Sequence, residues 1–246
     1  MTRPARLDLR VHPDLQALSD AAAESLVDLC QAAVREADRF AVALSGGNTP
    51  RTLYGLLATK YRALIPWRQV HVFWGDERYL PHDHPRSDYR MAREALLDHV
   101  PVSAVNVHPM PTHFAQPEEA ADAYQQTLRS HFPGEWPRFD LMLLGLGADG
   151  HAASLFPNNP ALDEEARWVT AVRAEAADPP LRLTLTLPAI NHAANVHFLV
   201  AGKDKAAALK RSLADKADRA SAPASAVSPV DGKVVWWVDR AAAILL

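Results

Sequence analysis

The chain has 246 residues, with 26 Lys and Arg against 29 Asp and Glu, and a net charge of −3 at pH 7. With 48% hydrophobic and 22% charged residues, the composition is that of a globular protein, which excludes a largely disordered chain. The near-neutral charge argues against a general nucleic-acid binder, and no apolar run approaches the ~20 residues of a membrane-spanning helix. We expect one domain over residues 1–246, with neither nucleic acid nor membrane as a partner.

Cys30 is the single cysteine, so the chain can form neither an intrachain disulfide nor a Cys-based zinc site. It lies in a segment of helical apolar periodicity, which favours a packed core thiol over a nucleophile. Residues 1–6 lead into an alternating pattern and not into an apolar signal core. We therefore expect a reduced, cytoplasmic protein.

The expected elements alternate between strands and helices. Residues 7–11 alternate like a half-buried strand, and 14 to about 37 show the apolar spacing of a long helix. There follow a strand at 40–44, a helix at 50–60, a strand at 70–74, a helix at 88–99, strands at 139–144, 181–187 and 196–200, a helix at 203–214, and a strand at 234–238 with a short helix after it. This order predicts an α/β fold with a mainly parallel, Rossmann-like doubly wound sheet and helices on both faces. The Ala/Ser/Pro-rich residues 217–232 are expected to be a loop.

In such sheets ligands bind outside the carboxyl ends of the strands, and the unusual residue clusters of this chain all follow strands. The first is Ser45-Gly46-Gly47-Asn48-Thr49-Pro50, between a strand and a helix. Its glycines leave room for a ligand, and Thr49 is expected to cap a helix whose free amides form an anion site. The spacing is not that of a P-loop, and a tight turn without a ligand is the alternative.

The second cluster is Gly75-Asp76-Glu77-Arg78, directly after a buried strand. Two acids and an arginine are costly to bury unless they are paired, so the cluster is either a solvated turn or a site that handles hydroxyls and protons. Downstream, His82 and His84 lie two residues apart in a Pro-rich loop, which is weak evidence for a metal site; we expect no metal ligands in this chain.

The third cluster, residues 145–151, holds three glycines, Asp149 and His151 after the most apolar strand. An imidazole has a pKa of ~6.5, so His151 is suited to proton transfer, and Asp149 is placed to orient it. A loop histidine without a role is the alternative.

Two cationic residues are candidate phosphate ligands. They are Arg182, on the polar side of an alternating strand, and Lys205, at a helix start, although an isolated lysine is usually a surface residue.

Together and in this order, these segments resemble the 6-phosphogluconolactonase family along nearly the whole chain. The segments that carry the resemblance are 43–50, 73–78, 87–94, 145–157 and 182–186. The family usually has Asn where this chain has Asp88. The wider group includes glucosamine-6-phosphate deaminases, whose comparable stretch has a Glu that assists sugar-ring opening. Here that place is Phe156, which cannot relay a proton, and Gly75-Asp76-Glu77-Arg78 also departs from the deaminase pattern.

The resemblance implies hydrolysis of 6-phospho-D-glucono-1,5-lactone to 6-phosphogluconate in the pentose phosphate pathway, without metal or organic cofactor. We expect His151 to act as general base on water, Asp149 to orient its imidazole, and Asp76 and Glu77 to bind sugar hydroxyls or support the proton path. The expected phosphate ligands are Ser45, Gly46, Gly47, Thr49, Arg182 and Lys205, with help from Arg78.

Two other functions are open at this point. An isomerase-deaminase would release ammonia from glucosamine-6-phosphate. A sugar-phosphate sensor of similar fold would usually carry an N-terminal helix-turn-helix, but here the sheet pattern starts at residue 7. For assembly, we expect a monomer or a weak homodimer.

Overall fold

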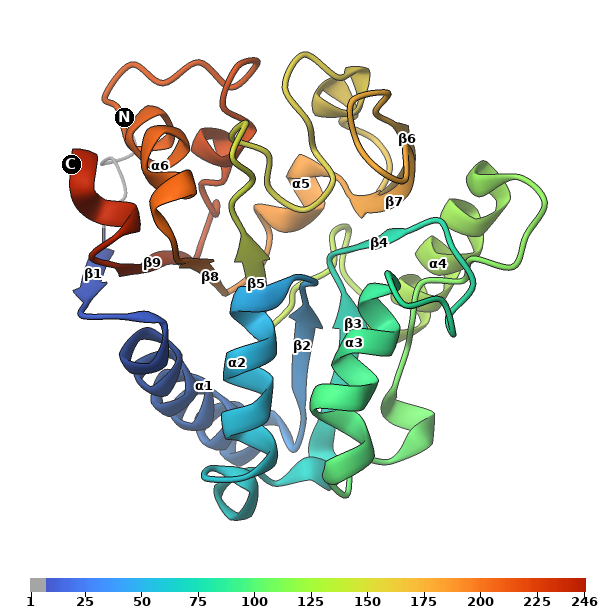
Figure 1. Ribbon diagram of the computed structural model, residues 1–246. Helices are drawn as coiled ribbons and strands as arrows, with labels where there is room; N and C mark the ends of the chain where they lie inside the picture. Colours follow the sequence, from blue (N-terminus) through green and yellow to red (C-terminus); the bar gives the residue numbers. More distant parts are fainter. Residues whose placement is uncertain (1–7) are drawn as a thin grey trace.

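The computed structural model describes residues 8–246 (Figure 1), so residues 1–6 and the expected strand start at residue 7 lie outside the described part. The larger of its two sheets contains β1 (Asp8–His12), β2 (Phe40–Leu44), β3 (Val70–Trp74), β5 (Leu141–Gly145), β8 (Asn195–Val200) and β9 (Lys233–Asp239). The α-helices are α1 (Leu15–Ala37), α2 (Asn48–Ala58), α3 (Asp88–Ala95), α4 (Pro117–His131), α5 (Leu187–Ile190) and α6 (Ala206–Ser212).

The strand order of the larger sheet is β1-β9-β8-β5-β2-β3, and every neighbouring pair is parallel. The expected mainly parallel α/β sheet is therefore confirmed. From β2 the chain moves outward to β3, whereas from β5 it moves the other way through β8 to β9. The connections thus diverge between β2 and β5, and a crevice for a ligand is expected at the carboxyl ends of these two strands.

Helix α1 shows how local sequence sets the elements around this sheet. The Asp14 side chain caps the helix by accepting a 2.8 Å hydrogen bond from the Ala17 amide, and the apolar stripe through Leu18, Leu26 and Cys30 is buried. Right-handed crossovers place helices on opposite faces when the strand order reverses. Accordingly, α1 and α6 lie on opposite sides of β8 and β9 (Figure 1).

Among residues 8–246, no helix has the length and apolar character needed to cross a bilayer.

The smaller sheet is antiparallel, in the order β4 (Asp76–Arg78), β7 (Leu181–Leu185) and β6 (Val169–Arg173). The expected strand at 181–187 therefore exists, but it belongs to this separate sheet. It pairs with Asp76–Arg78, the polar segment for which the sequence left a solvated turn and a functional site as alternatives. The Leu185 amide donates 2.8 Å to the Gly75 carbonyl, which ties the smaller sheet to the chain leaving β3.

Candidate active site

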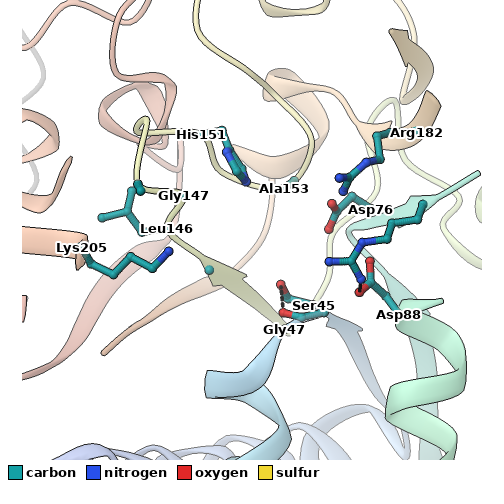
Figure 2. Close-up of a pocket in the computed structure, with 14 residues that line it drawn as sticks. Ser45, Gly47, Asp76, Asp88, Leu146, Gly147, His151, Ala153, Arg182 and Lys205 are labelled. Carbon is teal, nitrogen blue, oxygen red and sulfur yellow. Dashed lines mark hydrogen bonds and ion pairs between the residues drawn. The ribbon is translucent and has the colours of Figure 1, made fainter. Parts of the chain in front are cut away.

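A cavity of about 270 Å³ opens where the chain leaves β2 and β5, beside the smaller sheet (Figure 2). Its position matches the crevice that the strand order predicts. The lining residues are Ser45, Gly46, Gly47, Asp76, Arg78, Asp88, Gly145, Leu146, Gly147, Ala148, His151, Ala153, Arg182 and Lys205. Most of the residues proposed from the sequence are therefore brought together by the fold.

The Ser45-Gly46-Gly47 turn forms the floor of the cavity. The Tyr54 hydroxyl donates 2.8 Å to the Ser45 carbonyl and accepts from the Ser45 amide, which fixes the backbone of the turn. A Cβ on Gly46 would lie 1.7 Å from the Asp88 carboxylate, and Gly47 has a φ of 102°, so both positions need glycine. Among the described residues, no side chain caps α2, so the amides of its first turn remain available to an anion.

The expectation that Thr49 caps this helix is wrong. Gly47 is the capping residue, and Thr49 lies inside the first turn of α2 because the helix already begins at Asn48. Thr49 lines an adjoining pocket of about 310 Å³, which shares Gly46, Gly47 and Lys205 with the main cavity.

His151 and Asp149 form a hydrogen-bonded pair at the cavity. Nδ1 of His151 lies 2.7 Å from the Asp149 carboxylate, which also accepts a 3.1 Å bond from the His151 amide. Because the carboxylate accepts, Nδ1 carries the proton and Nε2 keeps its lone pair. Burial raises the pKa of Asp149, but the hydrogen bonds and charge of His151 outweigh burial and leave the pKa lowered. Asp149 therefore stays ionised and orients the imidazole.

The loop that carries this pair is closely packed from two sides. A Cβ on Gly147 would lie 2.1 Å from His151 Nδ1 and 2.5 Å from the Asp149 carboxylate. On the other side, Gly150 has a φ of 100° and packs against Ala222, and the Ala224 amide donates 3.0 Å to the Gly150 carbonyl. The segment after α6, which includes Ala222 and Ala224, thus supports the loop that holds the His151 imidazole.

Cations approach the cavity from two directions. Figure 2 shows Lys205 on one side and Arg182, next to Asp76, on the other. The smaller sheet pairs Arg78 directly with Arg182, so two guanidinium side chains come from neighbouring strands. Burial lowers the pKa of Arg182, while the nearby Asp76 carboxylate opposes the shift. Two close guanidinium groups with buried carboxylates beside them suit a bound anion.

Glu77 does not line the cavity, which corrects its expected part in binding or proton transfer. Its side chain is 1% exposed and points to the start of α3. There its carboxylate accepts hydrogen bonds from the amides of Arg78, Asp88 and Tyr89 and from the Ser87 hydroxyl, at 2.7–3.0 Å. Burial raises the pKa of Glu77, although these donors oppose the shift. Its acceptor sites are occupied by the protein itself.

Two polar residues, Asp88 in the cavity lining and Ser154 behind Asp76, were not assigned a role from the sequence. Asp88 is 3% exposed and holds Arg78 by a 2.6 Å ion pair, and its pKa is raised by burial and by the neighbouring Glu77 and Asp76 carboxylates. Ser154 donates a 2.7 Å hydrogen bond to Asp76. Asp88 directly follows Ser87, whose hydroxyl caps α3, so the capping pattern was the available signal for its placement.

The family profile described as glucosamine-6-phosphate isomerases/6-phosphogluconolactonase matches residues 13–236. This chain belongs to that family. A 6-phosphogluconolactonase of Synechocystis sp. is 47% identical over 213 residues, covering 85% of this chain and 86% of the relative. A 6-phosphogluconolactonase of Nostoc sp. is 41% identical over 237 residues, which cover 95% of this chain and 96% of the relative.

Solved structures of the same family share the fold. The 6-phosphogluconolactonase of Trypanosoma brucei has a TM-score of 0.87 at 32% identity, covering 98% of this chain and 99% of that one. A monomeric glucosamine-6-phosphate deaminase has a TM-score of 0.81 at 21% identity, and this likeness concerns the fold alone.

Proposed function

We propose that this chain is a 6-phosphogluconolactonase, which hydrolyses 6-phospho-D-glucono-1,5-lactone to 6-phospho-D-gluconate in the pentose phosphate pathway. The observation that carries the proposal is the His151–Asp149 pair. Its 2.7 Å hydrogen bond leaves Nε2 of His151 free, in the same cavity as Arg182 and Lys205. The relatives named 6-phosphogluconolactonase, at 47% and 41% identity, support the same substrate.

We place the substrate phosphate over the Ser45-Gly46-Gly47 turn as part of this proposal. There it meets the free amides at the start of α2, with Lys205 on one side and the Arg78–Arg182 pair on the other. These contacts are remote from the reacting carbonyl. Their binding energy therefore positions the lactone beside the imidazole and does not itself act on the ester bond.

His151 takes a proton from water at Nε2 while the water oxygen bonds to the lactone carbonyl carbon. Cations or amides of the glycine turns stabilise the tetrahedral oxyanion. When this intermediate collapses, the bond to the ring oxygen breaks, and the imidazolium returns the proton to that oxygen. Asp149 stabilises the imidazolium in between, because its carboxylate lies 2.7 Å from Nδ1.

Asp76 is assigned to the sugar hydroxyls. Ser154 donates to one of its carboxylate oxygens, and the carboxylate lines the cavity, so acceptor capacity remains for the substrate. Phe156 packs on His151 with the ring centroids 4.5 Å apart. It supplies an apolar wall at the position where deaminases of the wider group have a Glu, which favours lactone hydrolysis over ring opening of an amino sugar.

The proposal is tested by pH-stat assay of freshly made phosphorylated lactone, with subtraction of its spontaneous hydrolysis. We expect His151→Ala to lower kcat at least about a hundredfold while product affinity stays near that of the wild type. His113→Ala, at an exposed histidine, is the matched control and should keep full activity. Unchanged turnover in His151→Ala would remove the imidazole from the mechanism.

Two substrate comparisons test the rest of the proposal. Gluconolactone without the phosphate should be hydrolysed far less efficiently, because it lacks the group that the cations position. Equal kcat/KM for both lactones would refute the phosphate site. Ammonia release from glucosamine-6-phosphate at a comparable rate would instead assign the deaminase activity.

We also propose that the enzyme acts in the cytoplasm. The support is Cys30, a buried free thiol and the single cysteine of the chain. Burial raises the pKa of this thiol to about 12, so it stays protonated and unreactive.

A further inference from the structure

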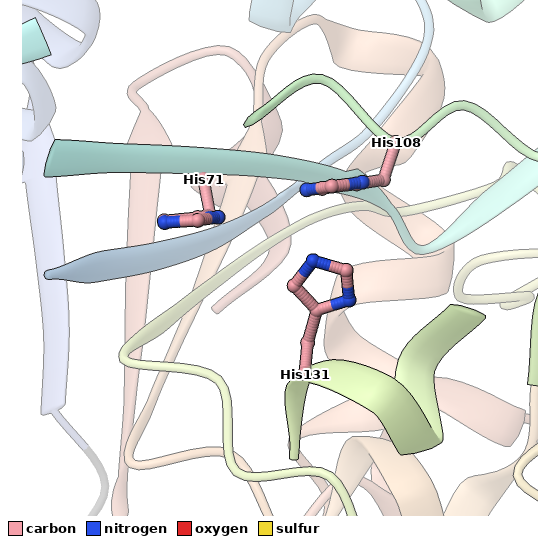
Figure 3. A group of neighbouring side chains, drawn as sticks. All are labelled: His71, His108 and His131. Carbon is pink, nitrogen blue, oxygen red and sulfur yellow. The ribbon is translucent and has the colours of Figure 1, made fainter. Parts of the chain in front are cut away.

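Three histidines from separate parts of the chain meet beside the N-terminal end of β3, away from the cavity at the carboxyl ends of the strands. They are His71 in β3, His108 after the short helical turn η4 (Ala104–Asn106), and His131 at the end of α4 (Figure 3). One ring nitrogen of each lies within 4.8 Å of those of the other two. None of the three lines the candidate active site.

Among residues 8–246, each of the three imidazoles keeps one ring nitrogen that makes no hydrogen bond. Nδ1 of His131 lies 2.8 Å from the Thr127 carbonyl and therefore carries the proton, which leaves Nε2 free. Within residues 8–246, Nδ1 of His71 and Nε2 of His108 are buried without a hydrogen-bond partner. Buried polar atoms of this kind are rare and need an explanation. Figure 3 shows the His131 ring beside the rings of His71 and His108, whose planes are nearly parallel at 5°.

We propose that His71, His108 and His131 bind one Zn²⁺ ion, at a site separate from the reaction cavity. Three imidazole nitrogens with a water as fourth ligand are a common zinc environment. Tetrahedral bonds of ~2.0–2.1 Å place ligand nitrogens about 3.3 Å apart, so the rings must approach by roughly 1.5 Å at most. The hydrogen bond from His131 Nδ1 to a backbone carbonyl is the outer contact that orients zinc-bound histidines.

An aromatic side chain borders two of the three imidazoles. Phe73 stacks on His108 with ring centroids 4.6 Å apart and meets His131 edge-on at 5.4 Å. This aromatic wall restricts water on one side of the cluster.

A bound ion would join three segments of the chain that already meet through backbone and side-chain hydrogen bonds. The His108 amide donates 2.8 Å to the Val72 carbonyl, and the Tyr124 hydroxyl of α4 accepts 2.9 Å from the Trp74 amide. Zinc would add a direct link among the same elements. Its role is therefore structural, and it should stabilise the fold without taking part in lactone hydrolysis.

The test uses the full-length protein without a polyhistidine tag, stripped with EDTA and titrated with ZnCl₂. We expect one zinc per chain by calorimetry and a Tm increase of roughly 5–10 °C at about 100 times the Kd. Co²⁺ in place of zinc should give the intense visible absorption of tetrahedral coordination. Both signals should be lost in His108→Ala and in His131→Gln and kept in His113→Ala, with each variant compared with its own metal-free form.

Two results would overturn the proposal. One is the absence of stoichiometric zinc binding by the wild-type protein. The other is a zinc-induced Tm shift that survives in His108→Ala and His131→Gln but disappears in His151→Ala, because that pattern would place the ion in the reaction cavity.

Discussion

At the scale of single residues, the backbone beside the His151 imidazole leaves no room for an additional side-chain atom. The backbone of Gly147 runs so close to the His151–Asp149 pair that a methyl group would overlap both side chains, at 2.1 and 2.5 Å. A positioned general base loses its effect when it is displaced by about 1 Å. The glycine-rich sequence at 145–150 is thus explained by packing around the proposed base, His151, as well as by ligand access.

We predict that Gly147→Ala lowers kcat by about a hundredfold, because the imidazole must move away from its carboxylate partner. The measurement is steady-state hydrolysis by pH-stat, with circular dichroism to confirm folding. Gly55→Ala is the control: the position is inside α2, and a Cβ there meets no atom of residues 8–246 within 4 Å. That variant should keep its activity and gain about 0.5–1 kcal/mol of stability. Equal activity of both variants would contradict the packing argument.

At the scale of elements, the start of α3 organises the cationic side of the cavity. Glu77 binds the first amides of α3, and the helix in turn places Asp88, which holds Arg78 at 2.6 Å. A carboxylate that is not in the cavity therefore determines where a guanidinium group of the cavity lies.

We predict that Glu77→Ala lowers the free energy of unfolding by about 2–4 kcal/mol, because several buried donors lose their acceptor. Affinity for the phosphorylated product should fall as well. Urea denaturation and calorimetry measure the two effects. The control is Glu94→Gln, which removes an exposed ion pair with Arg90 in the same helix and should change neither quantity appreciably. Wild-type stability in Glu77→Ala would show that the cap is dispensable.

Patterning predicts the elements of the parallel sheet well because buried strands are continuous apolar runs, as in residues 40–44 and 141–144. It misses β4 because Asp76–Arg78 is short and charged and becomes a strand only by pairing with β7. It misses α4 because the buried stripe of that helix begins with the small residues Ala120 and Ala121.

The same limits apply to the site. Residues that follow β2 and β5 could be grouped from the sequence, since parallel strands end at one edge of a sheet. The inward direction of the Glu77 side chain could not be predicted from the sequence. Neighbouring residues of a strand point to opposite faces, and the pairing of the strand decides which face is buried. The three histidines of the proposed zinc site have no spacing signature, since each comes from a different element.

At the scale of the whole molecule, the centre of the larger sheet contains a buried histidine, His197 in β8, that is 1% exposed. Burial, with a contribution from Arg10, lowers its pKa to about 3. An unfolded histidine titrates near ~6.5, so below that pH the unfolded chain takes up a proton that the folded protein does not. The stability that this group contributes is therefore complete above pH ~6.5 and decreases as the pH falls toward 3.

We predict that His197 alone accounts for about 2 kcal/mol of stability lost between pH 7.5 and pH 5. Urea denaturation at several pH values in EDTA should show a shallower dependence for His197→Gln, even if that variant is less stable throughout. His113→Ala should keep the wild-type dependence. An unchanged dependence in His197→Gln would assign the acid sensitivity to other groups.

The segment after α6 bears no reacting group, yet Ala222 and Ala224 lie directly behind Gly150. Chemistry at the ester can therefore be adjusted from a stretch that resembles a featureless spacer. Randomising this stretch offers a way to alter catalytic rate while every residue that contacts the sugar is left untouched. For the same reason, it is a poor place to insert a reporter or an affinity tag.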